Sequence, residues 1–204
     1  KGRIVGITGS SGKATTSTLT GELLKNAGIE TLVGGNIGTT LLSLAEKTTE
    51  NSWTVAELSS FQLETIKDFR PNVGLCLNVT PNHMDRYDFF TDYAAAKHRL
   101  FMNQTANDLA ILNADDEVTN SWTNGLKAHL TLFSTAKELD EGLFLRGREL
   151  VCRANGEEKV LTSRDDMTLS GIHNVQNILA GLAAGLACGA SPDSMKETIG
   201  NFKA

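Results

Sequence analysis

One segment near the start of the chain constrains the fold more than any other. An apolar, β-branched run over residues 4–8 passes into a loop rich in glycine and serine, and the loop ends at Lys13, where a helical pattern begins. Glycines let backbone N–H groups curve around phosphate oxygens, and a helix amino terminus adds favourable positive potential. The order strand, glycine loop, lysine, helix therefore predicts an α/β fold with a phosphate site.

The sequence of this loop departs from the usual phosphate-binding pattern G-x-x-x-x-G-K-[ST]. Ile7 stands where the first glycine is expected, and Ala14 stands where a hydroxyl normally contacts magnesium. Thr15 and Thr16 follow, and either could supply part of that contact. A glycine-rich turn without a ligand is the alternative, but folding alone hardly explains glycine and lysine together at a strand-to-helix junction.

Strand and helix patterns alternate through the first 125 residues. Strands are predicted at residues 4–8, 31–33, 54–58, 73–79 and 109–112, and helices at 15–27, 40–46 and 92–103. Such alternation predicts a mostly parallel sheet flanked by helices, with ligands beyond the carboxyl ends of the strands. Residues 129–169 hold short β pieces between turns, which predict a small antiparallel region, and helices follow at 174–188 and 192–202. We expect residues 1–204 to form a single domain.

Composition narrows the functional classes. Hydrophobic residues make up 40% of the chain and charged residues 21%, which is ordinary for a globular protein. The formal net charge of −5 argues against a nucleic-acid partner. No apolar run approaches the ~20 residues that span a bilayer, and no signal-peptide pattern is present. The three cysteines are widely separated and predict reduced thiols. We expect a cytoplasmic protein without membrane contact.

Six segments of the chain, in this order, resemble the central ATP-binding domain of the Mur ligases. The matching segments are TGSSGKATT at 8–16, GGNIG at 34–38, ELSSFQLE at 57–64, NVTPNHMDRY at 78–87, NADD at 113–116 and SGIHNVQN at 170–177. The first segment alone is moderately specific, whereas six segments in one order are highly specific. The segment at 57–64 is particularly similar to the members that add D-glutamate.

The resemblance implies a ligase reaction with ATP and Mg²⁺ as cofactors. In that reaction ATP phosphorylates a carboxylate of a UDP-linked muramoyl peptide precursor, and the amine of D-glutamate attacks the resulting acyl phosphate. The resemblance also implies an N-terminal UDP-substrate domain and a C-terminal domain that are absent from these 204 residues. This chain would then supply the ATP and magnesium site and be inactive alone.

The same resemblance assigns roles to individual residues. The implied nucleotide-binding residues are Gly9, Ser10, Ser11, Gly12, Lys13, Ala14, Thr15, Asn174 and Asn177. The implied magnesium ligands are Glu57, His83, Thr15 and Lys97, the last as a carbamate formed with carbon dioxide. Lys13, His83 and Lys97 are the implied catalytic residues, and Asn36, Ser59 and Arg86 the implied substrate contacts.

Each of these residues has an ordinary alternative role. Glu57 could be a solvated strand end, His83 an exposed loop residue, Lys97 a solvated helix lysine, Asn36 a turn residue, Arg86 a surface ion-pair partner and Asn174 a helix N-cap. Asp115 and Asp116 could simply begin a helix, where acidic residues suit the macrodipole.

Two other functions remain open from the sequence. The chain could be a nucleotide-binding module without catalysis, as Ala14 and the absent domains suggest. It could also come from a ligase like folylpolyglutamate synthase, which shares the ATP loop, but the segment at 57–61 argues against that assignment.

Overall fold

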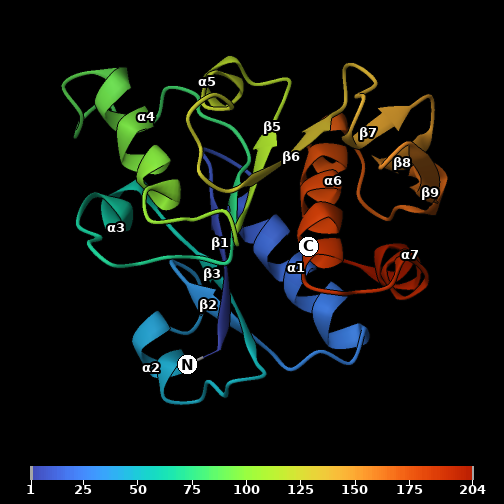
Figure 1. Ribbon diagram of the computed structural model, residues 1–204, viewed down its shortest axis with the longest axis horizontal. Helices are drawn as coiled ribbons and strands as arrows, with labels where there is room; N and C mark the ends of the chain where they lie inside the picture. Colours follow the sequence, from blue (N-terminus) through green and yellow to red (C-terminus); the bar gives the residue numbers. More distant parts are fainter. Residues whose placement is uncertain (1, 204) are drawn as a thin grey trace.

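A single nine-stranded sheet runs through the computed structural model, which describes residues 2–203, and helices cover both of its faces (Figure 1). The strands are β1 Arg3–Thr8, β2 Thr31–Gly35, β3 Trp53–Glu57, β4 Val73–Cys76, β5 Leu109–Asn113, β6 His129–Ser134, β7 Gly142–Arg146, β8 Glu149–Ala154 and β9 Glu157–Ser163. The α-helices are α1 Lys13–Asn26, α2 Leu41–Ala45, α3 Ser60–Glu64, α4 Phe90–His98, α5 Glu117–Ser121, α6 Ile172–Ala187 and α7 Pro192–Asn201. Two 3₁₀ turns are η1 Arg99–Phe101 and η2 Arg164–Asp166.

The strand order is β2-β3-β1-β4-β5-β6-β7-β8-β9. Every pairing from β2 to β7 is parallel, and β8 and β9 add antiparallel strands at one edge. The chain order reverses at β1, because β3 lies on one side of it and β4 on the other. In open α/β sheets, ligands bind beyond the carboxyl end of such a reversal. The predicted mostly parallel α/β fold is confirmed, and the glycine loop lies at the reversal.

The predicted antiparallel region is confirmed for β7 to β9, but it does not include β6. Residues 129–134 pair in parallel with β5, and Phe133 and Ser134 also pair in parallel with β7. Parallel neighbours need a crossover, and α5 lies in the connection between β5 and β6. A short alternating segment does not reveal the direction of its partner, so the sequence pattern could not separate β6 from the strands after it.

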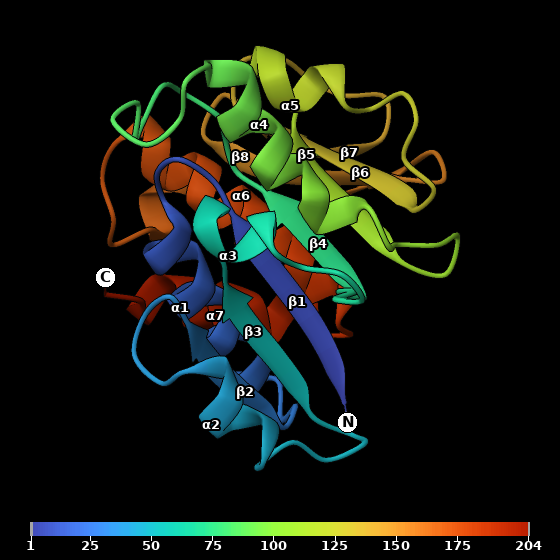
Figure 2. The same ribbon diagram turned by 90° about the vertical axis from the view of Figure 1, so that its left-hand side faces the viewer.

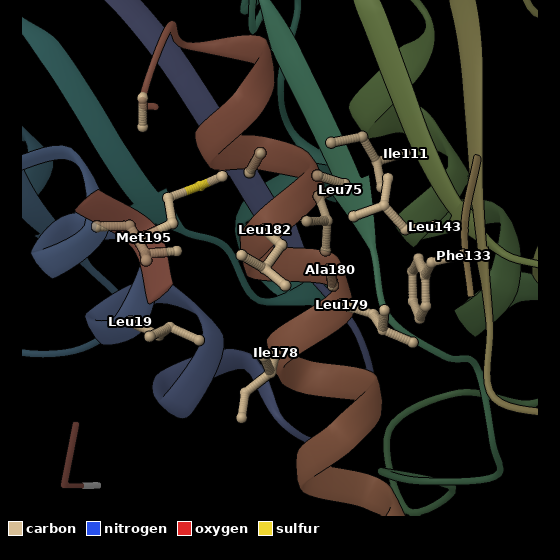
Figure 3. Close-up of a cluster of buried hydrophobic side chains, with 14 of the residues drawn as sticks. Leu19, Leu75, Ile111, Phe133, Leu143, Ile178, Leu179, Ala180, Leu182 and Met195 are labelled. Atoms are coloured by element: carbon tan, nitrogen blue, oxygen red, sulfur yellow. The ribbon is translucent and has the colours of Figure 1, made fainter. Parts of the chain in front are cut away.

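The two largest hydrophobic clusters lie on the two sides of the sheet. On one side, alternate residues of the central strands pack against α1, α6 and α7, as Figure 3 shows for Leu19 of α1, Leu75 of β4 and Leu182 of α6. On the other side, Leu63, Tyr93 and further residues of α3 and α4 pack against β3, β4 and β5. Burying each large apolar side chain contributes roughly 1.5–3 kcal/mol, so both layers hold the sheet in place.

Helix α6 packs close to its neighbours at two glycines. A Cβ on Gly181 would lie 3.1 Å from Leu19 Cδ2, and a Cβ on Gly185 would lie 2.7 Å from Met195 Sδ.

Among residues 2–203 no helix combines the length and the apolar character that a bilayer span requires.

Several element ends differ from the sequence prediction. Strand β4 stops at Cys76 instead of residue 79, and α4 tightens into a 3₁₀ turn at Arg99. Helix α3 was not predicted, although Ser59 and Gln62 form a capping box at its start. Helix α6 begins at Ile172 with Gly171 as its N-cap, so the N-cap alternative for Asn174 is wrong.

Candidate phosphate and metal site

The candidate site is built where β1, β3 and β4 end. The glycine loop follows β1 and turns back into α1, as Figure 2 shows. Glu57 is the last residue of β3, and Asn78 follows β4 by two residues. Because parallel strands share one carboxyl edge, these three features come together although they are far apart in the sequence.

Gly12 gives the loop its shape at the start of α1. It has a left-handed φ of 81°, and a Cβ at this position would lie only 2.2 Å from Asn177 Oδ1 of α6. Any side chain would therefore be strained and would collide with α6. Asn177 is 6% exposed, and its Nδ2 donates to Asn174 Oδ1 at 3.4 Å. The structure thus brings Asn177 against the glycine loop and places Asn174 beside it.

The backbone N–H groups of the loop fall into two sets. Those of Ser10 and Ser11 donate to Asn78 Oδ1 at 3.0 and 2.9 Å. Those of residues 12–15 open α1, where helix geometry gives N–H groups no partner within the helix, and within the described chain no side chain caps this end. Residues 12–15 therefore offer a set of N–H donors at the positive end of the helix dipole.

Two lysines lie under the loop and share one acceptor. Lys13 Nζ and Lys97 Nζ each donate to the carbonyl oxygen of Gly9 at 2.9 Å, so the two amines are no further apart than twice that distance. Lys97 is 1% exposed, and its Nζ lies 4.6 Å from the centre of the Tyr93 ring. Burial, and to a lesser extent the charge of Lys13, lowers the pKa of Lys97 to about 8. Burial also lowers the pKa of Lys13.

Glu57 is 2% exposed and only half satisfied. Its Oε1 accepts from Asn36 Nδ2 at 3.0 Å, whereas its buried Oε2 has no partner among the described residues. A buried carboxylate oxygen without a donor is costly unless a cation or water meets it. Carboxylate oxygen is also the ligand type that magnesium prefers, so this atom fits the predicted metal. The solvated alternative for Glu57 does not hold, because the residue is buried.

The other predicted metal ligands are arranged less compactly. His83 is exposed, has a left-handed φ of 55° and packs against Phe61 with ring centres 5.1 Å apart. Thr15 is half-buried and Ala14 is exposed, whereas Thr16 is fully buried and its Oγ1 has no partner among the described residues. Within residues 2–203, no three His, Cys, Asp or Glu side chains gather closely enough to hold a metal by themselves.

The predicted substrate contacts are engaged in local bonds. Arg86 pairs with Glu64 at 3.2 Å and stacks its guanidinium on Phe61 at 4.8 Å. Ser59 caps α3 by accepting from Gln62 N. Asn36 donates to Glu57, as described above. Of these three, Asn36 directly contacts another predicted site residue.

Sequence reasoning assigned no role to three residues that contact the loop or its lysines. Asn78 bonds the loop backbone, and Tyr93 Oη lies 3.0 Å from Ser10 Oγ. Cys76 is fully buried near the charges of both lysines, and burial raises its pKa to about 12, so it stays a neutral thiol. The sequence signal for Asn78 was its position near the carboxyl end of a predicted strand, at the edge where ligands bind.

Asp116 begins a helix, as its ordinary alternative requires, whereas Asp115 lies just before that helix and bonds the end of β6. Asp116 is the N-cap of α5 and accepts from Thr119 N at 2.9 Å. Asp115 binds Ser134 Oγ at 2.6 Å and Thr135 N at 2.6 Å at the end of β6. Both carboxylates therefore hold connections of the fold together.

Fold and site together define an α/β protein with a glycine loop at the reversal point of a mostly parallel sheet. The profile of the Mur ligase middle domain matches residues 7–185, and the chain belongs to this family.

Curated relatives and solved structures support that membership. The chain is 43% identical over its whole length to the UDP-N-acetylmuramoylalanine--D-glutamate ligase of Koribacter versatilis, and 47% identical over its whole length to that of Citrifermentans bemidjiense. It spans 45% of the length of each relative. A solved UDP-N-acetylmuramoyl-L-alanyl-D-glutamate--2,6-diaminopimelate ligase shares the fold, with a TM-score of 0.79, 21% identity and coverage of 100% of this chain and 47% of that one.

Proposed function

We propose that this chain is the central ATP-binding domain of a cytoplasmic ligase that joins D-glutamate to a UDP-linked muramoyl-alanine precursor. One observation carries the proposal. At one edge of the sheet, the first N–H groups of α1 meet the half-buried Lys13, the buried Lys97 and a half-satisfied buried carboxylate. Relatives named as ligases of that reaction, at 43% and 47% identity, support D-glutamate as the added amino acid.

The proposed nucleotide site uses the loop and the start of α6. The N–H groups of residues 12–15 bind phosphate oxygens, and Lys13 exchanges its bond to the Gly9 carbonyl for a charge-assisted bond to phosphate. Asn174 and Asn177 lie next to the loop and approach the base side of the nucleotide. Phosphoryl transfer depends mainly on positioning and charge neutralisation, which these groups supply without forming a covalent bond.

The proposed metal site centres on Glu57. Its unpartnered Oε2, the hydroxyl of Thr15, His83 and a carbamylated Lys97 would hold magnesium together with water and phosphate oxygens. Bound magnesium supplies neutralisation of the charge on the transferring phosphoryl group. The lowered pKa of Lys97 favours the neutral amine that must react with carbon dioxide.

The remaining proposed roles concern the precursor. Asn36 and Ser59 lie beside Glu57, one bonded to it and the other two residues after it, and would orient the carboxylate that is phosphorylated. Arg86 would leave its exposed ion pair with Glu64 to contact the acyl phosphate. An exposed ion pair contributes at most about 1 kcal/mol, so this exchange is inexpensive.

The test is ADP release by the full-length protein in the presence of the muramoyl-alanine precursor. We expect release to require D-glutamate, and to fail with other amino acids and with folate. Turnover with a different amino acid would mean that this ligase adds that amino acid and not D-glutamate. Turnover with folate would overturn the proposed function. Release of ADP by residues 1–204 alone would refute the proposal that the other two domains complete the site.

A second function, nucleotide binding without catalysis, is favoured for the isolated chain by Ala14. This exposed residue offers no hydroxyl at the position where the loop pattern places a magnesium contact. Calorimetry with ATP and magnesium on residues 1–204 separates the cases. Micromolar binding without turnover supports the module, whereas no binding at millimolar ATP means that the loop is not a competent site alone.

A further inference from the structure

Asn78 makes more bonds to the glycine loop than any site residue discussed above. Its Oδ1 accepts from Ser10 N at 3.0 Å and from Ser11 N at 2.9 Å, and its Nδ2 donates to Ser11 O at 3.3 Å. Its own backbone carbonyl also accepts from Ser10 N at 3.0 Å. A single side chain thus holds the N–H groups of Ser10 and Ser11 and the carbonyl group of Ser11.

The segment that carries Asn78 is itself held from both sides. Leu77 N donates to Thr8 O at 3.0 Å, which continues the pairing of β4 with β1. On the other side, Asn113 Nδ2 donates to Leu77 O at 2.9 Å, and Asp116 Oδ2 accepts from Val79 N at 3.1 Å. Side chains of β5 and α5 therefore replace the backbone ladder beyond Cys76, which explains why β4 ends early and why Asn78 is free to face the loop.

From these contacts we infer that Asn78 is a positioning residue for nucleotide binding. It fixes residues 10–11 so that the N–H groups of residues 12–15, and not those of Ser10 and Ser11, meet the phosphates. This inference rests on the proposed function. It limits the loop N–H groups that bind phosphate to those of residues 12–15. Preorganising the donors before the nucleotide arrives lowers the entropic cost of binding.

The opposite possibility is that Asn78 occupies a phosphate position and is displaced by the nucleotide. The bond from Asn78 Nδ2 to Ser11 O argues against displacement. Phosphate oxygens accept hydrogen bonds and could replace Oδ1, but a fully ionised phosphate has no hydrogen to donate to the Ser11 carbonyl. Displacement would also leave Asn78 to find new partners beside a segment that is already paired.

Hydrogen exchange of the wild-type chain, followed by NMR, tests the inference without any substitution. We expect the Ser10 and Ser11 amides to be protected in the nucleotide-free protein, and the amides of residues 13–15 to exchange quickly. Addition of ADP and magnesium should protect residues 13–15 and leave Ser10 and Ser11 protected. Loss of protection at Ser10 and Ser11 on ADP addition would show displacement and overturn the inference.

Two substitutions add a binding measurement. Asn78→Leu keeps the size but removes every side-chain bond, and we expect ADP affinity to fall ~10–30-fold, as one to two lost net hydrogen bonds would produce. Asn78→Asp keeps an acceptor for both N–H groups, so amide protection at Ser10 and Ser11 should persist in this variant. Loss of that protection in Asn78→Asp, or unchanged ADP affinity in Asn78→Leu, would refute the assigned role.

Asn103→Leu is the matched control. Asn103 also uses its amide to bridge two backbone groups, the carbonyls of Lys67 and Phe69, but it does not touch the loop. We expect this variant to lose stability and keep its ADP affinity. If wild-type protein binds no ADP, the proposed function fails, whereas the nucleotide-free exchange pattern still reports on the loop. If Asn78→Leu does not fold, wild-type exchange and Asn78→Asp decide the question.

Discussion

The buried amine of Lys97 should react with carbon dioxide at neutral pH, where an ordinary lysine hardly reacts. With a pKa of about 8, about a tenth of the amine is neutral at pH 7 and about nine tenths at pH 9. At the unperturbed value of 10.5, only a few molecules in ten thousand would be neutral at pH 7. The structure therefore predicts a neutral fraction roughly 300-fold larger than for an exposed lysine.

The direction of the pH effect follows from the reaction. Carbamylation joins the neutral amine nitrogen to the carbon of carbon dioxide and releases one proton, so it accelerates as pH rises through 8. At a fixed concentration of dissolved ¹³CO₂, we expect the initial rate of carbamate formation at Lys97 to rise about tenfold between pH 7 and pH 9. Trapping the carbamate by alkylation, followed by peptide mass spectrometry, measures that rate.

Two variants make this measurement decisive. Lys97→Met must abolish the label, and peptides that carry the exposed Lys67 serve as internal controls. Lys13→Met removes the nearby charge, and the midpoint should rise by less than about one pH unit because burial is the larger cause of the lowered pKa. The reasoning is refuted if the label is equal in wild type and Lys97→Met, or if the midpoint lies near that of an exposed lysine.

Three further predictions concern the loop and the metal. Glu57→Gln should weaken magnesium-dependent ADP binding at least tenfold and leave magnesium-free binding nearly unchanged, because the unpartnered carboxylate oxygen is lost; calorimetry with and without magnesium measures both. Ala14→Ser should tighten magnesium–ADP binding several-fold by restoring a hydroxyl, and unchanged affinity would mean that Thr15, water or another group already fills that role. Gly12→Ala should lower the free energy of unfolding by about 2–4 kcal/mol in chemical denaturation, since it adds a collision with Asn177 to the cost of a left-handed φ.

Gly28→Ala is the control for the last of these variants. Gly28 has a similar φ of 76°, but a Cβ there meets nothing within 4 Å. This variant should therefore cost only about 1 kcal/mol. Equal destabilisation at both glycines would show that the close approach of Asn177 to Gly12 does not add to the loss in free energy of unfolding.

The parts of the fold that the sequence predicts well are those with a strong local pattern. The buried β-branched run of β1, the glycine loop and the helical spacing of α1 all occur where expected. Helix α4 also overlaps the predicted helix at 92–103, and it buries Tyr93 and Ala96. The local pattern did not predict that β6 is parallel, because the direction of a strand depends on a partner that is distant in sequence.

The candidate site shows the same division. Family resemblance named Glu57 and Lys97, but a glutamate at a strand end and a lysine in a helix are each more often solvated. Their burial depends on β1 and β2, which pair with β3 on either side of Glu57, and on the loop passing over Lys97. Asn78 received no role, because its bonds reach across 67 residues to Ser11 and no local pattern reports them.

The sequence by itself determined the class of fold, the position of the glycine loop and the family, because short motifs carry those features locally. Only the tertiary structure decided which loop N–H groups are already bonded, which carboxylate oxygen lacks a partner and which lysine loses its solvent. Those properties depend on desolvation and on hydrogen bonds between strands far apart in the chain, and both arise only when the sheet assembles.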